Sequence, residues 1–522
     1  MKQLFEKRLA AVAAYEGEAL HGGLKGVEKE SLRVNKDGPL SSQPHPIALG
    51  SALTNRYITT DFSEALLEFV TPAFASTWEA LQCVCDIHQF TYSQLDEEML
   101  WSASMPCMIP EDEKIPLAQY GTSNVGRMKT IYRRGLGFRY GRQMQVIAGV
   151  HFNYSLPADI WPLYQQVLGA KQNAEQFRSD QYLGLVRNFR RMGWLVLYLF
   201  GASPALCKSF ASGASAGLKS LSADTYFEPH ATSLRMSDLG YSNQNQSKIN
   251  ISLNSLDEYV DDLSKAIRTP EPDYEKIGVK VDGRHRQLNA NLLQIENEFY
   301  SPVRPKRVAE SGEQPTAALR RDGIEYVEIR SLDINPFDPC GINQNTMRFV
   351  EAFLIYCLLE DSPMLDNESL DEIGRNHART AKYGRAPDFR LSRDGAAVPL
   401  QTWASEILCN VLAVAKVIDS HEKNEGYADA VRLMQELVDD PEKTPSARVL
   451  ADLKETQSGF SEYALALARS HNDYFASLAP LRESRKAIFD EEVAESLLRQ
   501  KQIEASDEIS LDEYLQRYFS NT

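Results

Sequence analysis

Gly26-Val-Glu-Lys-Glu-Ser-Leu-Arg-Val34 is the stretch from which the fold is best read. In a β-strand successive side chains point to opposite faces, so Glu28 and Glu30 share one face of the strand that this stretch predicts. A strand with one polar and one apolar face is typical of an antiparallel sheet. Two neighbouring carboxylates on such a face repel each other unless a cation lies between them.

Two further stretches have the same character. Glu68 lies in Ala65-Leu-Leu-Glu-Phe-Val-Thr-Pro72, and Glu328 shares a face with Arg330 in Ile324-Glu-Tyr-Val-Glu-Ile-Arg-Ser-Leu332. Mg²⁺ takes oxygen ligands and shares carboxylates with substrate phosphates. The acidic strands therefore indicate a metal–nucleotide site. Each strand taken alone is equally consistent with a solvated face at the edge of a sheet.

Composition limits the classes of function. The 522 residues exceed the usual size of one domain, and 43% hydrophobic with 25% charged residues is typical of a soluble globular protein. A formal net charge of −16 argues against a nucleic-acid partner. It leaves room for a small anionic substrate, which a local group of Arg and Lys side chains can bind.

The sequence shows no clear signal for secretion, for a membrane span or for a cysteine-based site. The N-terminal stretch carries Glu6 and Glu16 and predicts a helix, not a secretion signal. The most apolar run, Gly193 to Gly201, is far shorter than the roughly 20 residues of a membrane span. The seven cysteines are scattered and contain no C-x-x-C pair, so we expect no zinc site, no disulfide framework and a cytoplasmic location.

The chain divides into two regions of different character. Residues 1–345 mix helical stretches with predicted strands at 26–34, 66–71, 145–155, 245–253, 276–281, 290–300 and 324–333. Their irregular spacing favours a large antiparallel or mixed sheet with helices packed on it, an α+β fold. Residues 346–522 show helical periodicity and few motifs. We therefore predict a catalytic core over 1–345 and a helical C-terminal region over 346–522.

Several polar motifs allow two interpretations. The segment 129–142 holds five cations and two tyrosines, which suits either a basic surface helix or a clamp for carboxylates and phosphates. His151 lies in an apolar run, where a hydrogen-bonded core histidine is more common than a ligand. Asp61 fits a metal ligand or a helix N-cap. The segment 121–128 has P-loop glycine spacing but lacks the Lys and Ser/Thr that touch phosphate and Mg²⁺, so we reject it.

Longer motifs occur in order from about residue 20 to 345. They are Glu28–Arg33, Thr59–Phe62 with Leu67–Pro72, Ala118–Asn124, Gly149–Asn153, Phe200–Ala205, Ala231–Tyr241, Gln294–Glu298 and Ile324–Pro336. Together they resemble the glutamate–cysteine ligases of the proteobacterial type. The last third of the chain resembles that family only loosely.

This resemblance implies ATP-dependent joining of the L-glutamate γ-carboxyl to the amine of L-cysteine, the first step of glutathione synthesis. It also implies a fold similar to glutamine synthetase, with a curved, mainly antiparallel sheet like a partly open barrel and helices outside. A carboxylate is a poor electrophile at neutral pH, so amide formation requires activation, here as a γ-glutamyl phosphate. Cations that gather around the transferred phosphoryl group stabilise its charge.

The resemblance also implies roles for individual residues. The metal-site residues are Glu28, Glu30, Asp61, Glu68, His151 and Glu328, for Mg²⁺ or for Mn²⁺ in its place. Glu68, Glu328 and Arg330 are expected to be catalytic. Contacts with substrate or phosphate come from Arg133, Arg235 and Arg330. The cysteine side of the pocket is formed by Tyr132, Leu136, Gln145, Tyr241 and Tyr300, while Lys306 and Arg307 are weaker candidates for phosphate contacts.

The expected partners are small molecules: L-glutamate, L-cysteine and ATP, with glutathione as a feedback inhibitor. We expect a monomer that binds neither nucleic acid nor membranes. Two other functions remain open at this stage. One is a glutamate–amine ligase with a different amine acceptor, and the other is an inactive homologue that binds glutamate or nucleotide as a regulator.

Overall fold

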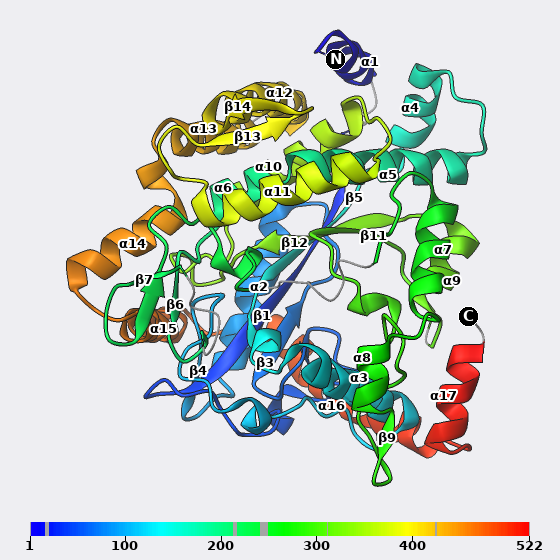
Figure 1. Cartoon of the computed structure of the whole chain (residues 1–522), viewed down its shortest axis with the longest axis vertical. Coiled ribbons are helices and arrows are strands. Elements are labelled where there is room, and N and C mark those ends of the chain that lie inside the picture. The colour runs from blue at the N-terminus through cyan, green and yellow to red at the C-terminus, as the bar shows by residue number, and fades with distance from the viewer. Residues whose placement is uncertain are drawn as a thin grey trace.

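A seven-stranded antiparallel sheet forms the centre of the computed structural model (Figure 1). The structure describes residues 2–15, 20–211, 217–240, 249–310, 312–422 and 425–520. The strands lie in the order β11-β12-β5-β1-β3-β2, and β4 also pairs with β1. Their bounds are β1 Leu24–Asn35, β2 Ile58–Thr60, β3 Leu66–Val70, β4 Glu98–Leu100, β5 Val150–Ser155, β11 Val303–Lys306 and β12 Tyr326–Leu332. Every pairing along this path is antiparallel, so the predicted antiparallel α+β fold is confirmed, and β11 and β2 form the two edges of the open sheet.

The two faces of the sheet differ in chemistry because of strand alternation. Val27, Phe152 and Ile329 lie on one face, and each is fully buried in the main hydrophobic core. Helices α2 and α5 contact this sheet, α2 at β1 and α5 at β11 and β12. Glu28, which pairs directly with His151 across β1 and β5, lies on the other face. One set of strands thus packs a core on one face and presents polar groups on the other.

Helices cover the sheet and make up most of the C-terminal region. In chain order, the helices of the N-terminal region are α1 Lys2–Ala13, α2 Thr77–Tyr92, α3 Asn124–Tyr140, α4 Ile160–Leu168, α5 Ala174–Met192, α6 Trp194–Phe200, α7 Leu256–Ala266, α8 Pro272–Ile277 and α9 Pro315–Asp322. They continue with α10 Gln344–Leu359, α11 Asn367–Tyr383, α12 Leu400–Glu422, α13 Gly426–Asp439, α14 Pro445–Thr456, α15 Phe460–Ser477, α16 Glu483–Ala505 and α17 Leu511–Ser520. Short strands form three small sheets: β6 Ala205–Cys207 with β8 Thr225–Phe227 and β7 Lys219–Ser220, β9 Lys280–Val281 with β10 Arg284–His285, and β13 Arg390–Arg393 with β14 Ala396–Pro399.

Some of the predicted strands are wrong. The segment 290–300 contains an isolated bridge at Asn291 and a short 3-10 turn, Glu296–Glu298, but no strand, because the side chain of Asn289 binds its backbone. Asn289 Oδ1 accepts a hydrogen bond from the backbone N–H of Asn291 (3.0 Å), and the Asn289 amide donates to the carbonyl of Gln294 (2.9 Å). Such local bonds compete with strand pairing. Of 276–281 only β9 is a strand, of 145–155 only β5, and the described part of 245–253 contains none.

The C-terminal region packs against the N-terminal one. The main core is continuous from Phe5 to Phe475, and α10 at its centre contacts α5, α12 and α13. Helix α16 returns to the N-terminal region, where the hydroxyl of Ser496 accepts a hydrogen bond from the backbone N–H of Ser51 (3.1 Å). Apart from the β13–β14 hairpin, the described residues after 346 form no strands, and the boundary at 345 stays a prediction. No helix of the described residues is long and apolar enough to cross a membrane.

Candidate active site

The polar face of the sheet brings the acidic strands together. Glu30 pairs directly with Glu68 across β1 and β3, and Glu28 pairs with His151 across β1 and β5. Glu328 of β12 lies opposite Asn153 of β5, one strand further along the sheet. Direct cross-strand neighbours have Cβ atoms about 4.5–5.5 Å apart, so strand register alone concentrates the carboxylates.

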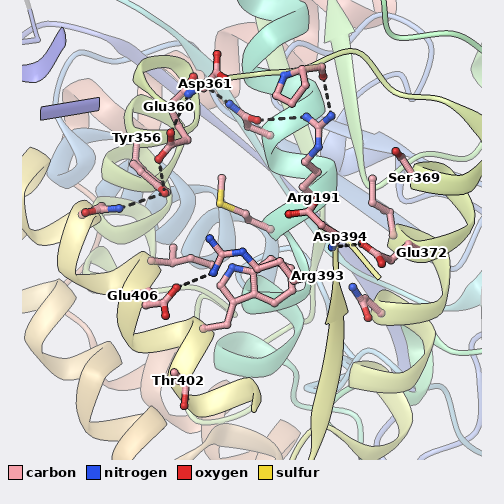
Figure 2. A pocket seen from close by; sticks show the side chains of 18 of the residues that line it. Arg191, Tyr356, Glu360, Asp361, Ser369, Glu372, Arg393, Asp394, Thr402 and Glu406 are labelled. Atoms are coloured by element: carbon pink, nitrogen blue, oxygen red, sulfur yellow. Dashed lines mark hydrogen bonds and ion pairs between the residues drawn. The ribbon is translucent and has the colours of Figure 1, made fainter. Parts of the chain in front are cut away.

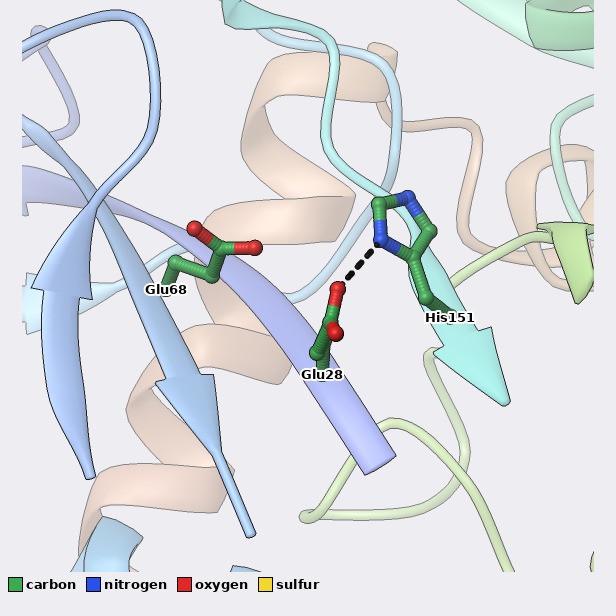
Figure 3. Close-up of side chains that lie close together, drawn as sticks. All are labelled: Glu28, Glu68 and His151. Carbon is green, nitrogen blue, oxygen red and sulfur yellow. Dashed lines mark hydrogen bonds and ion pairs between the residues drawn. The ribbon is translucent and has the colours of Figure 1, made fainter. Parts of the chain in front are cut away.

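Glu28, Glu68 and His151 form the tightest group (Figure 3). One ligand atom of each lies within 4.8 Å of the others. Figure 3 shows the side chains of His151 and Glu28 directed toward each other. The distance between His151 Nδ1 and Glu28 Oε2 is 3.0 Å. The other oxygen of Glu28 accepts a hydrogen bond from the side chain of Asn153 at 2.9 Å. Oxygen and nitrogen atoms in this arrangement can hold a divalent cation.

Burial and repulsion between carboxylates raise the pKa values of two of the carboxyl groups. Burial raises the pKa of Glu68 well above its usual range, and the carboxylates of Glu28 and Asp61 raise it further. Burial also raises the pKa of Glu30, although the nearby His151 opposes this shift. A carboxyl group whose ionised form is disfavoured in this way gains from a cation placed beside it.

Two other carboxyl groups remain ionised because cations surround them. Burial alone would raise the pKa of Glu328, but Lys306 and Arg330 hold it well below the usual range. Lys306 Nζ lies 3.7 Å from Glu328 Oε1, and Arg330 Nη1 lies 3.2 Å from Glu328 Oε2. For Glu28 burial is likewise opposed, and the hydrogen bond with His151 leaves its pKa below the usual value. The four carboxyl groups of the site therefore have pKa values shifted in opposite directions, upward for Glu68 and Glu30 and downward for Glu28 and Glu328.

These groups line a cavity of about 390 Å³ between the sheet and α3. That volume is within the usual range for a small-molecule site. The lining includes every predicted metal-site residue and most of the predicted substrate contacts: Tyr132, Arg133, Leu136, Gln145, Tyr300 and Arg330. The structure thus places these residues, which are far apart in the sequence, around one space.

The structure decides between the two interpretations of Asp61, a metal ligand or a helix N-cap. It follows β2 and no helix begins there, so the N-cap interpretation is wrong. Its carboxylate lies 3.9 Å from Arg133 Nη2, and Arg133 Nε also donates to the backbone carbonyl of Asp61. Arg133 is thereby held at the cavity wall.

Comparison with known proteins identifies the family. The family model described as glutamate-cysteine ligase matches residues 9–380. The chain belongs to the glutamate–cysteine ligase family. It is 48% identical to the glutamate–cysteine ligase of Alcanivorax borkumensis over 99% of this chain and 100% of that protein. It is 46% identical to the enzyme of Pseudomonas putida over 99% of this chain and 98% of that protein.

Solved structures agree with this family. The glutamate–cysteine ligase of Francisella tularensis, solved in complex with AMP, has a TM-score of 0.91 and 36% identity, covering 96% of this chain and 98% of that one. A bifunctional glutathione synthetase from Pasteurella multocida has a TM-score of 0.70 and 25% identity, covering 94% of this chain and 57% of that one. The similarity extends through the C-terminal helices, which carry none of the predicted site residues.

One predicted substrate contact of this glutamate–cysteine ligase family member, Arg235, is not in the cavity wall. Arg235 is buried behind it, 3.5 Å from Asp333 Oδ1, and donates to the backbone carbonyl of Arg330 at 3.1 Å. A Cβ atom at Gly149 would lie 2.1 Å from Arg235 Nη2, so a side chain there would displace this arginine. Tyr241 lies outside the described residues. The roles of both stay predictions.

Sequence reasoning missed several residues of the cavity wall. Arg304 was not singled out, although it lies two residues before Lys306 on β11 and therefore shares its face. Lys129 and Glu298 also line the cavity. Arg307, the other weak candidate for a phosphate contact, donates instead to the carbonyl of Asp322 at 2.6 Å. Strand alternation was the signal that could have separated Lys306 from Arg307.

A separate cavity of about 650 Å³ lies among α5, α10, α11 and α12 (Figure 2). Trp403 forms part of its wall, with the guanidinium of Arg393 5.3 Å from the ring centroid. Arg393 also pairs with Glu406 at 2.6 Å. None of the predicted site residues lines this cavity. The predicted metal-site residues line the cavity beside the sheet instead.

Proposed function

We propose that the cavity beside the sheet is where the chain activates glutamate as γ-glutamyl phosphate and joins it to cysteine. The enzyme catalyses ATP-dependent formation of γ-glutamylcysteine, the first step of glutathione synthesis. The observation that carries the assignment of the site is the gathering of Glu28, Glu30, Glu68 and Glu328 beside Arg330 and Lys306 on one sheet face. Phosphoryl transfer to a carboxylate brings several negative charges together and requires such a mixed surface.

The donor set fits Mg²⁺. Its oxygen atoms are hard ligands, and the raised pKa values of Glu68 and Glu30 mark carboxyl groups whose burial and carboxylate neighbours outweigh the protein's own cations. Glu28, Glu30, Asp61, Glu68, His151 and Glu328 are the residues that would hold the metal. Mn²⁺ accepts similar ligands and is the alternative. When bound, the metal ions would offset charge on the ATP phosphates and on the transferred phosphoryl group.

The cations on β11 and β12 stabilise the first step. In that step a γ-carboxylate oxygen of glutamate attacks the γ-phosphorus of ATP, and the bond to the ADP oxygen breaks. Arg330 and Lys306 lie beside Glu328, and Arg304 pairs with Glu328 in strand register. Fixed positive groups at developing negative charge lower the barrier without reorganisation. We assign Arg330 and Lys306 to the transferred phosphate.

The wall formed by α3 receives the second substrate. The amine of cysteine attacks the acyl carbon, the bond to the phosphate oxygen breaks, and phosphate leaves as the nitrogen loses a proton. Tyr132 and Leu136 project from α3 into the cavity, and Tyr300 and Gln145 complete this wall. Aromatic and aliphatic groups suit a thiol better than a strongly hydrated group. We assign these residues to the cysteine side chain.

Partners beyond the substrates are also proposals. Glutathione contains the γ-glutamylcysteine unit, so it fits the glutamate and cysteine subsites and would inhibit by competing with glutamate. We expect a cytoplasmic monomer, which sedimentation of the purified protein and cell fractionation test. Inhibition that glutamate does not relieve would place glutathione elsewhere on the molecule.

The decisive experiment measures nucleotide products with glutamate, in the presence and absence of cysteine. We expect ADP, phosphate and γ-glutamylcysteine in equal amounts when all three substrates are present. AMP with pyrophosphate would contradict the acyl phosphate. Equal turnover with an amine that lacks the thiol would indicate a different acceptor, and no ATP consumption would indicate a regulator.

A further inference from the structure

Helix α3 has a second lined face, turned away from the sheet cavity. Arg127, Ile131, Arg134 and Phe138 recur at intervals of three to four residues, which places them along one side of the helix. Tyr132 and the other residues of α3 that line the sheet cavity do not line this second face. The helix therefore separates two cavities.

The second cavity has a volume of about 830 Å³. The β9–β10 hairpin forms the wall opposite α3, and Leu511 of α17 closes one side. Figure 1 shows the three elements α3, β9 and α17 close together in the lower part of the molecule. Three separate parts of the chain thus build this space, and its volume is within the range of small-molecule sites.

Positive charge is concentrated in this cavity. Arg127, Arg134, Arg284 and Arg286 line it, and Asp282 is the only carboxylate among its lining residues. This local excess of cations stands in a chain whose formal net charge is −16. Burial lowers the pKa of Arg134, and the neighbouring Arg142 and Arg284 lower it further, so these cations repel one another.

The side chains of two of the four arginines have no hydrogen-bond or ion-pair partner among the described residues. Arg127 and Arg284 are exposed, and their guanidinium groups form no hydrogen bond or ion pair with any residue that the structure describes. Asp512 lies close to the cavity, but its carboxylate contacts Lys280 Nζ at 2.8 Å and His285 Nε2 at 3.2 Å. Its partners are therefore Lys280 and the cavity-lining His285, and among the described residues it forms no ion pair with the four arginines.

The other two arginines are held in place by the protein. Arg134 Nη1 donates to the carbonyl of His285 at 2.7 Å, and Arg286 Nη1 donates to the carbonyl of Ile277 at 3.1 Å. The guanidinium of Arg286 also lies 5.5 Å from the ring centroid of Phe138, whose side chain is 48% exposed. Fixed guanidinium groups beside an exposed ring suit a ligand that combines phosphate with a flat ring.

We propose that this arginine-lined cavity is a second ligand site that binds a phosphate-bearing polyanion. Arginine binds phosphate oxygens through paired N–H groups, and four such side chains match more than one phosphate. Phe138 supplies a stacking surface if the ligand is a nucleotide, and an inorganic polyphosphate requires the arginines alone. The site is independent of the reaction assigned to the sheet cavity.

Calorimetric titration with inorganic tripolyphosphate and with ADP tests this site. A chelator is included, so that without metal the carboxylates of the sheet cavity repel both probes. We expect the double variant Arg127→Ser/Arg284→Ser to bind tripolyphosphate at least tenfold more weakly than the unaltered protein. The control, Arg268→Ser/Arg375→Ser, makes the same charge change at two exposed arginines outside this cavity and is expected to stay within twofold.

Ligase activity of each variant shows that it is folded, since neither pair lies in the sheet cavity. Phe138→Ala then separates the two sources of phosphate. Weaker binding of ADP with unchanged tripolyphosphate binding supports a nucleotide site, and unchanged binding of both supports a site for the phosphate chain alone. Binding that is equal in the Arg127/Arg284 variant and the control, or no binding below 1 mM by the unaltered protein, overturns the proposal.

Discussion

At the scale of single residues, the surroundings of each carboxyl group decide its charge. Glu68 and Glu328 are the same residue type on the same sheet face, but their pKa values are shifted in opposite directions. Burial and neighbouring carboxylates raise the pKa of Glu68, whereas Lys306 and Arg330 outweigh burial at Glu328. The free protein therefore holds a proton at Glu68 under conditions in which Glu328 is ionised.

This difference predicts that metal binding releases a proton. A metal competes with the proton on Glu68, whose pKa is raised, so Mg²⁺ is expected to bind more tightly as the pH rises. Glu68→Gln should weaken binding and remove most of the proton release, while Glu79→Gln on the exposed face of α2 should change neither. Calorimetry in two buffers of different ionisation enthalpy measures the protons released. A dissociation constant that does not change between pH 6 and 8 would contradict the assignment of Glu68.

Substitution of Arg330 tests whether catalysis depends on the geometry of its guanidinium group or on its positive charge alone. Its Nη1 lies 3.2 Å from Glu328, and its backbone carbonyl is fixed by Arg235. Arg330→Lys keeps the charge but loses the planar pair of donors, so we expect kcat to fall by a factor of about a hundred. Arg320→Lys, at an exposed arginine that pairs with Asp261, is the control. Steady-state kinetics that match the unaltered enzyme would reduce Arg330 to a counter-ion.

At the scale of elements, strand alternation sorts neighbouring residues into different roles. Lys306 is the last residue of β11 and lies 3.7 Å from Glu328, whereas Arg307 turns outward to Asp322 and Glu325. We expect Lys306→Met to lower kcat/KM at least tenfold, because it removes positive charge beside the transferred phosphate. Arg307→Met should change kcat/KM less than twofold. Equal losses in both variants would mean that β11 acts only through its fold.

The same alternation explains how much of the fold was predictable. Strands β1, β3 and β12 were recognised because each alternates a carboxylate with apolar residues. The segment 290–300 has similar composition, but the side chain of Asn289 binds the backbone of Asn291 and Gln294 and competes with strand pairing. Composition cannot reveal such a bond, since it depends on which carbonyl comes within reach. Helix α3 was expected to have either a binding face or a solvated basic face, and it has both a cavity-lining side and an arginine-rich side.

At the scale of the whole molecule, the site exists only because distant segments meet. The sheet cavity combines β1, β3, β5, β11 and β12 with α3 and the loop around Tyr300. The identities of most of these residues could be inferred from the sequence through a family resemblance, but the arrangement could not. Leu511 and Leu515 of α17 pack with Met128 and Ile131 of α3, so the C-terminal helix supports the wall that carries Tyr132. Nothing in the periodicity of α17 indicates which helix it contacts.

A half-buried histidine between such distant elements makes the assembled protein sensitive to acid. His377 of α11 is held against α5, where its Nε2 lies 3.0 Å from the carbonyl of Arg190. Burial, with a contribution from Arg190, lowers the pKa of His377 from 6.5 to about 4. In the unfolded chain this histidine binds a proton near pH 6.5, so its contribution to stability is complete above that pH and is lost as the pH falls toward 4.

We therefore expect His377→Gln, which keeps an N–H donor for the carbonyl of Arg190, to flatten the acid side of the stability profile. The free energy of unfolding of the unaltered protein should fall by about 2 kcal/mol more than that of the variant between pH 7 and pH 4.5. Urea unfolding at a series of pH values measures this difference. The control His230→Gln removes an imidazole that does not lie between α11 and α5. If His377→Gln and the unaltered protein lose stability in parallel, protonation of His377 does not limit the docking of α11 on α5, and acid acts on the molecule elsewhere.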